Sequence, residues 1–157
     1  MSTTERINSL NFAIYLYQRA VERGITPNVT QIQKWLYVCY GIFLRAHNSQ
    51  LLDEKPEAWD YGPFFPNVHK AQKKTDGNLA LLASRINEND FVDFIPIIDV
   101  VMRHFGNLTA GQLVDWTHEV GSAWHQQWHG RKKSGGRYTA MDNHDIILDF
   151  ERLYSNG

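Results

Sequence analysis

Cysteine is almost absent from this chain, and neither sign of charge dominates it. The 157 residues include one cysteine, Cys39, and carry a formal net charge of −1. A single cysteine excludes an internal disulfide framework and favours a reducing compartment, so we expect a cytoplasmic protein. Because the net charge is close to zero, no overall field attracts nucleic acid or an anionic membrane, and any such contact needs a local patch.

Long hydrophobic runs are missing as well. No stretch approaches the ~18 consecutive apolar residues that mark a membrane-spanning helix. The first ten residues, MSTTERINSL, lack the basic segment followed by an apolar segment that is typical of a secretory signal. With 43% hydrophobic and 21% charged residues, the composition is that of a globular protein. The length predicts a single domain over residues 1–157.

Apolar residues recur at helical spacing along most of the chain. The segment IQKWLYVCYGIFLRA, within about residues 29–46, is apolar on nearly every side, which is typical of a helix at the centre of a bundle. Thr30, followed three residues later by Gln33, predicts a capping box at its start. Proline is favoured at the first position of a helix, so another helix should begin near Pro66. The sequence therefore predicts a mainly α-helical, compact multi-helix domain around a buried central helix.

One segment, EAWDYGPFFPNVHK at residues 57–70, departs from this pattern. Prolines at 56, 63 and 66 remove backbone donors, so we expect a proline-rich irregular loop at 55–66 that is neither helix nor regular strand. Such a loop must either pack its large aromatic side chains into the core or hold them out for a partner. Those side chains are Trp59, Tyr61, Phe64 and Phe65.

Histidines gather nearer the carboxyl end of the chain. His125 and His129 are four residues apart and would share one face of a helix, as metal ligands often do, with His118 nearby. However, Gly121 is expected to break the helix before this pair, and no glutamate stands between them as in a metalloprotease motif. We therefore expect no metal and no other cofactor. A metal-dependent hydrolase that uses the histidines of 118–129 is the alternative.

The segment GRKKSGGR, residues 130–137, contains four basic residues and no acidic one. It lacks the Lys-Ser/Thr pair of a phosphate-binding loop, and no strand precedes it. A solvated loop and a contact with phosphates or an acidic partner both remain open. Cys39 lies in the most apolar helix, where a thiol is usually inert, and the chain has no Gly-x-Ser-x-Gly elbow. Since no catalytic set stands out, we expect a protein that is not an enzyme.

The order of these motifs resembles the Panacea, or SocA-like antitoxin, family, which includes phage-associated GepA-like proteins. The resemblance runs through IQKWLYVCYGIFLRAHNSQLLDEKPEAWDYGPFFPNVHKAQ and rests mainly on the pattern Trp-x-Tyr-Gly-Pro-x-x-Pro at residues 59–66. It resumes in LVDWTHEVGSAWHQQW and covers about residues 10–154. Ala123 departs from the proline that the family commonly has before the tryptophan, which loosens the second motif.

The resemblance implies a mainly helical antitoxin of a bacterial or prophage toxin–antitoxin system. Such a protein neutralises a cognate toxin, encoded by an adjacent gene, through direct protein–protein contact. Some relatives are associated with delivering a toxin to a protease as adaptors, so a protease is a second candidate partner. A third class is an autoregulator that binds operator DNA through Lys70, Lys73, Lys74 and the 130–137 loop, but no clear helix-turn-helix supports it.

The residues of the 55–66 loop are expected to divide into two roles. For Trp59, Gly62, Pro63 and Pro66 we expect a rigid turn clamped over the central helix, with Trp59 buried against Trp35 or Leu36. Aromatic side chains are enriched at interfaces, and a proline-stiffened loop loses little entropy on binding. The candidates for toxin contact are Tyr61, Phe64, Phe65, His69, Trp124, Trp128, Arg131, Lys132 and Lys133.

Overall fold

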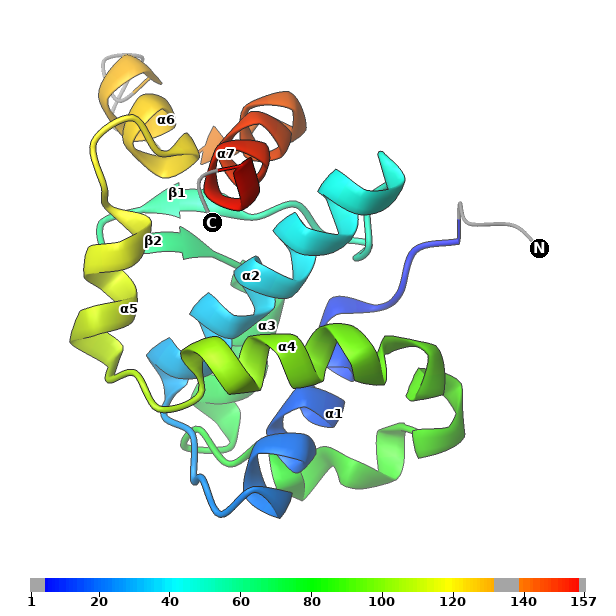
Figure 1. Ribbon diagram of the computed structural model, residues 1–157. Helices are drawn as coiled ribbons and strands as arrows, with labels where there is room; N and C mark the ends of the chain where they lie inside the picture. The colour runs from blue at the N-terminus through cyan, green and yellow to red at the C-terminus, as the bar shows by residue number, and fades with distance from the viewer. Residues whose placement is uncertain (1–4, 132–138, 156–157) are drawn as a thin grey trace.

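The computed structural model describes residues 5–131 and 139–155 (Figure 1). In chain order the elements are α1 (Ser9–Glu22), α2 (Val29–His47), β1 (Glu57–Trp59), β2 (Gly62–Phe64), α3 (Pro66–Lys74), η1 (Leu79–Arg85), η2 (Glu88–Phe94), α4 (Ile95–Phe105), α5 (Ala110–Thr117), α6 (Ala123–Arg131), β3 (Thr139–Ala140) and α7 (Asn143–Ser155), where η denotes a 3₁₀ helix. The mainly α-helical fold is confirmed. Within these two ranges, no helix combines the length and the hydrophobicity needed to cross a bilayer.

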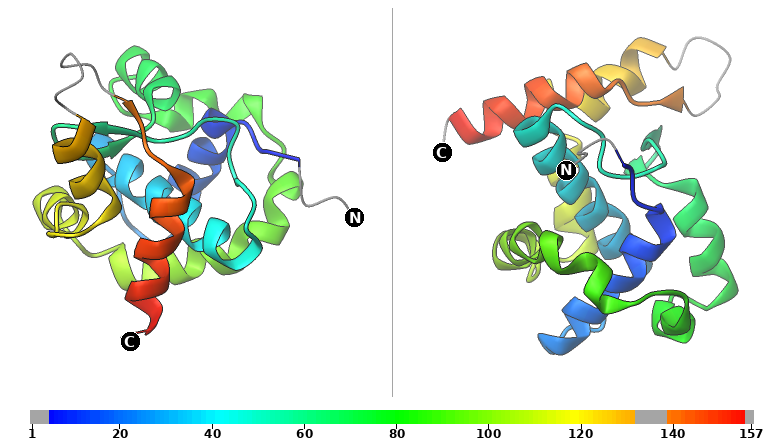
Figure 2. Two further views of the ribbon diagram at one scale, coloured as in Figure 1. Left: turned by 90° about the horizontal axis from the view of Figure 1, so that it is seen from above. Right: turned by 90° about the vertical axis from the view of Figure 1, so that its right-hand side faces the viewer.

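Helix α2 is the central helix that the sequence predicts, and every residue from Ile32 to Gly41 is buried. Helices α1, α4, α5 and α7 all contact it, and both views of Figure 2 show α7 crossing it. Its amino end differs from the prediction. The capping box is formed by Asn28 and Gln31, whose side chains each bond the other's backbone N–H, and not by Thr30 and Gln33. The helix therefore starts two residues earlier than the Thr30 signal indicates.

The segment expected to be an irregular loop forms a short antiparallel hairpin instead. Strands β1 and β2 pair Glu57 with Phe64 and Trp59 with Gly62, and β3 adds to the other side of β1. The prolines were taken to exclude strands, but they fall where a strand tolerates them. Pro63 lies on β2 at the edge of the sheet, and Pro66 is the first residue of α3.

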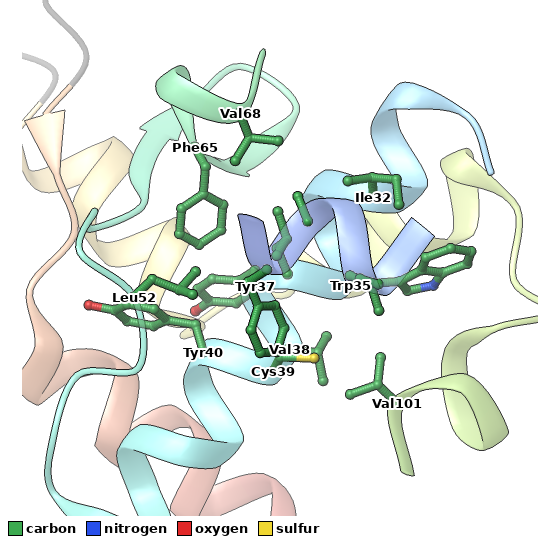
Figure 3. Close-up of a cluster of buried hydrophobic side chains, with 14 of the residues drawn as sticks. Ile32, Trp35, Tyr37, Val38, Cys39, Tyr40, Leu52, Phe65, Val68 and Val101 are labelled. Atoms are coloured by element: carbon green, nitrogen blue, oxygen red, sulfur yellow. The ribbon is translucent and has the colours of Figure 1, made fainter. Parts of the chain in front are cut away.

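The core forms where the hairpin, α2 and the helices around it meet. Figure 3 shows Phe65 directed inward toward the cluster that contains Tyr40, and the two rings lie 5.9 Å apart. The indole of Trp35, also fully buried, donates a hydrogen bond to the carbonyl oxygen of Phe105 at 3.0 Å. Burial of these large side chains supplies the main driving force for folding, while the indole N–H keeps a partner.

Helix α7 approaches α2 so closely that a side chain at Gly41 would occupy the space of the Phe150 ring. Phe150 is itself buried and packs edge-on against Tyr37, with ring centroids 5.7 Å apart, so it has little room to move. We expect Gly41→Ala to lower the free energy of unfolding by about 1–3 kcal/mol, the usual cost of overpacking a core. Urea denaturation followed by circular dichroism measures the change.

Gly111→Ala is the matched control, because Gly111 is also helical but a Cβ there would meet only the Thr109 hydroxyl, at 3.9 Å. Helix propensity alone favours alanine by up to about 1 kcal/mol, so this variant should be unchanged or slightly more stable. Equal stability of the two variants would contradict the close α2–α7 packing.

Candidate functional site

Two neighbouring residues of α2 hold the hairpin in place. Gln33 accepts a hydrogen bond from the backbone N–H of Phe65 at 2.7 Å and donates one to its carbonyl oxygen at 3.2 Å. Lys34 donates from Nζ to the carbonyl oxygen of Pro63 at 2.9 Å. Both side chains are buried. Because a buried polar group that loses its partner is costly, these bonds fix where the hairpin sits on α2.

Lys34 is a buried cation, with only 1% of its surface exposed. Among the residues that the structure describes, no carboxylate lies within ion-pair distance of it. Burial disfavours the charged form and lowers the pKa of the Lys34 ammonium to about 7, from 10.5. Lysines are rarely buried without an acidic partner, so this amine is chemically unusual.

Gly62 lets the hairpin approach α2 and α5 closely. Its φ of +110° is a conformation that side chains rarely adopt. A Cβ at this position would lie 2.5 Å from Thr117 Oγ1 and 3.1 Å from Lys34 Cε. The Gly-Pro pair of the sequence motif therefore serves the contact between the strand and the two helices.

The outer face of the hairpin carries aromatic side chains. The rings of Trp59 and Phe64 lie 4.3 Å apart, and His69 packs edge-on against Phe64 at 4.7 Å. All three side chains are half-buried, whereas Tyr61 at the turn is 74% exposed. Burial and nearby Lys73 lower the pKa of His69, which favours its neutral form. We call these four side chains the hairpin surface.

A second aromatic group, carried by α5 and α6, adjoins the hairpin. His118 stacks on Trp124 with 3.7 Å between ring centroids, and Trp124 stacks on Trp128 at 5.6 Å. The indole of Trp124 donates to the carbonyl oxygen of Trp59 at 2.7 Å. Burial, together with the positive charge of Lys34, lowers the pKa of His118. The hydrogen bond between Trp124 and Trp59 therefore joins the hairpin to the His118–Trp128 segment, although the two lie about 60 residues apart in sequence.

A pocket of about 230 Å³ opens between the hairpin and the amino end of α2. The hairpin surface supplies part of its wall, and Lys34 supplies another part. Its lining consists of Val29, Thr30, Gln33, Lys34, Trp59, Asp60, Tyr61, Gly62 and Phe64.

The structure separates the aromatic residues that the sequence treats as one group. Tyr61, Phe64 and His69 reach the surface, but Phe65 is fully buried and offers no side-chain atom to a partner. Trp59 was expected to be buried against Trp35 or Leu36. It lies half-buried at the surface instead, with its indole N–H bonded to Glu57 Oε1 at 2.9 Å.

The remaining candidate contacts lie on α6 and beyond it. Trp124 is only 5% exposed, while Trp128 is half-buried. Arg131 is the last residue of α6, and Lys132 and Lys133 lie outside the described residues. Of the predicted contacts, therefore, the structure brings Tyr61, Phe64 and His69 together on one surface.

Within the residues that the structure describes, neither a metal site at the histidines nor a reactive cysteine thiol is supported by the geometry. His125 and His129 are close, with ring centroids 4.4 Å apart, but no group of three or more His, Cys, Asp or Glu side chains in residues 5–131 and 139–155 could hold a metal ion. Cys39 is fully buried, and burial raises the pKa of its thiol far above the ordinary value. The predicted position of Cys39 inside the apolar central helix is confirmed.

Sequence reasoning missed the buried polar residues Gln33, Lys34 and Thr117. Lys34 is the only charged residue between Ile32 and Leu44, inside a mostly apolar segment. A charged residue within a helix that is apolar on every side has no solvated face available. That signal alone marks Lys34 as a residue with a specific buried environment.

Comparisons with known proteins identify the same family that the sequence motifs resemble. A family model described as "Antitoxin SocA-like, Panacea domain" matches residues 32–125, which include most of α2, the hairpin and the His118–Trp124 stack. The curated protein "Antitoxin SocA" of Caulobacter vibrioides (strain NA1000 / CB15N) is 25% identical over 134 residues, covering 76% of this chain and 70% of that protein. No solved structure matches the chain significantly.

The close approach at Gly62 is testable by a paired substitution. Gly62→Ala and Gly121→Ala both place a side chain on a backbone with positive φ, +110° and +87°. A Cβ at Gly121 meets only Arg152 Nη1, at 3.7 Å, whereas one at Gly62 collides with Thr117. Gly62→Ala should therefore cost about 1–3 kcal/mol more than Gly121→Ala in urea denaturation. An equal loss would mean that the hairpin can move away without penalty.

The buried amine predicts how stability changes with pH. The pKa of Lys34 is about 7 when folded and 10.5 in the unfolded reference, so above pH 7 the unfolded chain binds more protons and stability rises with pH. The gain approaches about 1.4 kcal/mol per pH unit between these values and vanishes below pH 7. Lys34→Met should lack this contribution, so in urea melts the stability of the wild type relative to Lys34→Met should rise from pH 7 to 9. Parallel curves would contradict the buried, unpaired amine.

Proposed function

The chain belongs to the family of SocA-like antitoxins with a Panacea domain, and from this premise we propose that it neutralises a cognate toxin by binding it directly. Membership supports an antitoxin role in general terms. The proposal adds that the toxin is encoded by an adjacent gene and that inhibition arises from protein–protein contact, without catalysis by this chain. We also propose that the pair acts in the cytoplasm and that residues 1–157 form one domain.

The observation that carries the proposal is the hairpin surface. It presents an exposed tyrosine beside half-buried Trp59 and Phe64 on a hairpin that buried hydrogen bonds fix to α2. Aromatic side chains on a rigid support make strong interface anchors, because little conformational entropy is lost when they bind. An ordinary turn between strands gives no reason for three adjacent aromatic side chains at the surface.

We propose that toxin contact centres on Tyr61, Phe64 and His69 and extends over Trp128 toward Arg131. The hydrogen bond from Trp124 to the Trp59 carbonyl links these two areas. Phe65 is excluded from the interface because its ring lies in the core. A further role, as an adaptor that delivers the toxin to a protease, would use a surface separate from the one that the toxin covers.

Substitution of the anchors tests the proposal. Tyr61→Ala and Phe64→Ala should each weaken binding to the toxin by about 1–3 kcal/mol, the range expected for interface anchors, while the fold persists. Expression of the neighbouring toxin should arrest growth, and wild-type antitoxin should restore it. The affinity of the purified pair is measured by calorimetry, and growth rescue is scored in parallel.

Two further variants act as controls. Leu81→Ala removes an exposed apolar side chain, 67% accessible, from η1, which packs mainly on α1, so it should bind as the wild type does. Phe65→Ala should lose about 3–5 kcal/mol of stability, as expected for a buried aromatic residue. If Tyr61→Ala and Phe64→Ala both bind and rescue normally, the toxin contact lies elsewhere.

A further inference from the structure

The pocket beside the hairpin favours a negatively charged group. Val29 and Thr30 of its lining form the first turn of α2, and the amino end of a 19-residue helix carries partial positive charge. Lys34 belongs to the same lining, and its buried side chain, only 1% exposed, brings a positive charge close to the pocket whenever the amine is protonated. These two features come from separate physical sources, the backbone dipoles and a side-chain charge, and both attract an anion.

Lys34 also retains hydrogen-bonding capacity. An ammonium group has three N–H donors, and the carbonyl oxygen of Pro63 accepts from Lys34 at 2.9 Å. In the described residues Lys34 has no acidic partner, so its buried charge is uncompensated whenever the amine is protonated. A carboxylate that enters the pocket would supply the missing countercharge and accept further bonds.

The size and walls of the pocket suit a side chain. At about 230 Å³ it is smaller than the roughly 300–1,000 Å³ of typical small-molecule sites. Its walls include Trp59, Tyr61 and Phe64, the same aromatic residues that form the hairpin surface. A protein that covers the hairpin surface would therefore bring its own side chains to the mouth of this pocket.

We infer that the pocket receives the carboxylate of an Asp or Glu side chain of the bound toxin, which forms an ion pair with Lys34. This inference rests on the proposed function and names the chemistry of the central contact. The charged groups around Lys34 are His118, with Asp115 near it, and Asp60 on the exposed turn of the pocket lining. Burial and the charge of Lys34 lower the pKa of His118, and an imidazole, whether neutral or positive, does not supply a countercharge to an ammonium group.

Proton uptake on binding distinguishes this ion pair from other contacts. In the free protein the Lys34 amine has a pKa of about 7, so at pH 8 it is mostly neutral and must take up a proton to pair with a carboxylate. We expect calorimetry at pH 8, in two buffers of different ionisation enthalpy, to detect uptake of close to one proton per complex. The Kd for the toxin should rise roughly tenfold from pH 7.5 to 8.5.

Substitutions of Lys34 test whether this residue takes up the proton on binding. In Lys34→Met the uptake and the pH dependence should disappear, and Kd at pH 7 should rise about 30-fold or more, as expected when one partner of a buried charge pair is removed. Lys34→Gln, which can still donate a hydrogen bond, replaces it if Lys34→Met does not fold. Lys70→Met removes an exposed lysine of α3 and should keep the wild-type profile.

Every result of these measurements either supports or contradicts the ion pair between Lys34 and a toxin carboxylate. Toxin variants with single Asp→Asn or Glu→Gln changes should include one that abolishes uptake, and a toxin shortened at its C-terminus should not. Binding by the wild type without proton uptake, or with uptake that persists in both Lys34 variants, overturns the ion pair and leaves the proposed function standing. Loss of uptake only in the shortened toxin overturns the side-chain assignment. No binding at any pH overturns both proposals.

Discussion

The hydrogen bonds from Gln33 and Lys34 to the backbone of Pro63 and Phe65 position the hairpin and the aromatic side chains around it. Gln33 holds both backbone groups of Phe65, and Lys34 holds the carbonyl of Pro63. A buried hydrogen bond to a charged group contributes about 1.5–3 kcal/mol, but burying the ammonium costs a comparable amount or more. The hydrogen bond between Lys34 and Pro63 therefore contributes little net stability. Its effect is to specify one position of the hairpin, since any displacement leaves buried polar groups without partners.

Once the hairpin is fixed, neighbouring residues acquire opposite environments. Phe65 points into the core against Tyr40, while Phe64 lies at the surface between Trp59 and His69. The carbonyl of Trp59, held at the end of β1, accepts the bond from Trp124 that brings the α5–α6 stack alongside. One fixed position of the hairpin on α2 therefore brings both aromatic groups together. The same constraint that orders the core also orders the surface proposed to meet the toxin.

The sequence predicts the central helix well, because a continuous apolar segment can only be buried, and it predicts the helix start at Pro66 from proline's fixed φ. It fails at the hairpin because a count of prolines does not show that Pro63 lies at a sheet edge, where no amide donor is needed. Nor do residue types separate Phe64 from Phe65, since adjacent aromatic residues differ only in the side of the chain to which they point. An apolar segment around a single lysine marks Lys34 as unusual, but no local pattern shows its partner, which is a hairpin carbonyl 29 residues away.

The buried amine also bears on how a nearly neutral protein could select a partner. With a net charge of −1, the chain has little long-range field, so discrimination must arise from local contacts. An amine that is half-neutral near pH 7 gains its full charge only when an anion stands beside it, because burial otherwise favours the neutral form. An apolar or cationic group in the pocket would gain nothing from Lys34 and would still pay for its own desolvation. Selectivity for an anionic partner therefore arises both from attraction to Lys34 and from the cost of placing an apolar or cationic group in the pocket. It requires the amine to stay buried until the partner binds. The hairpin that Lys34 holds in place also shields the amine from bulk water, and the pocket at the amino end of α2 is the side from which a partner approaches.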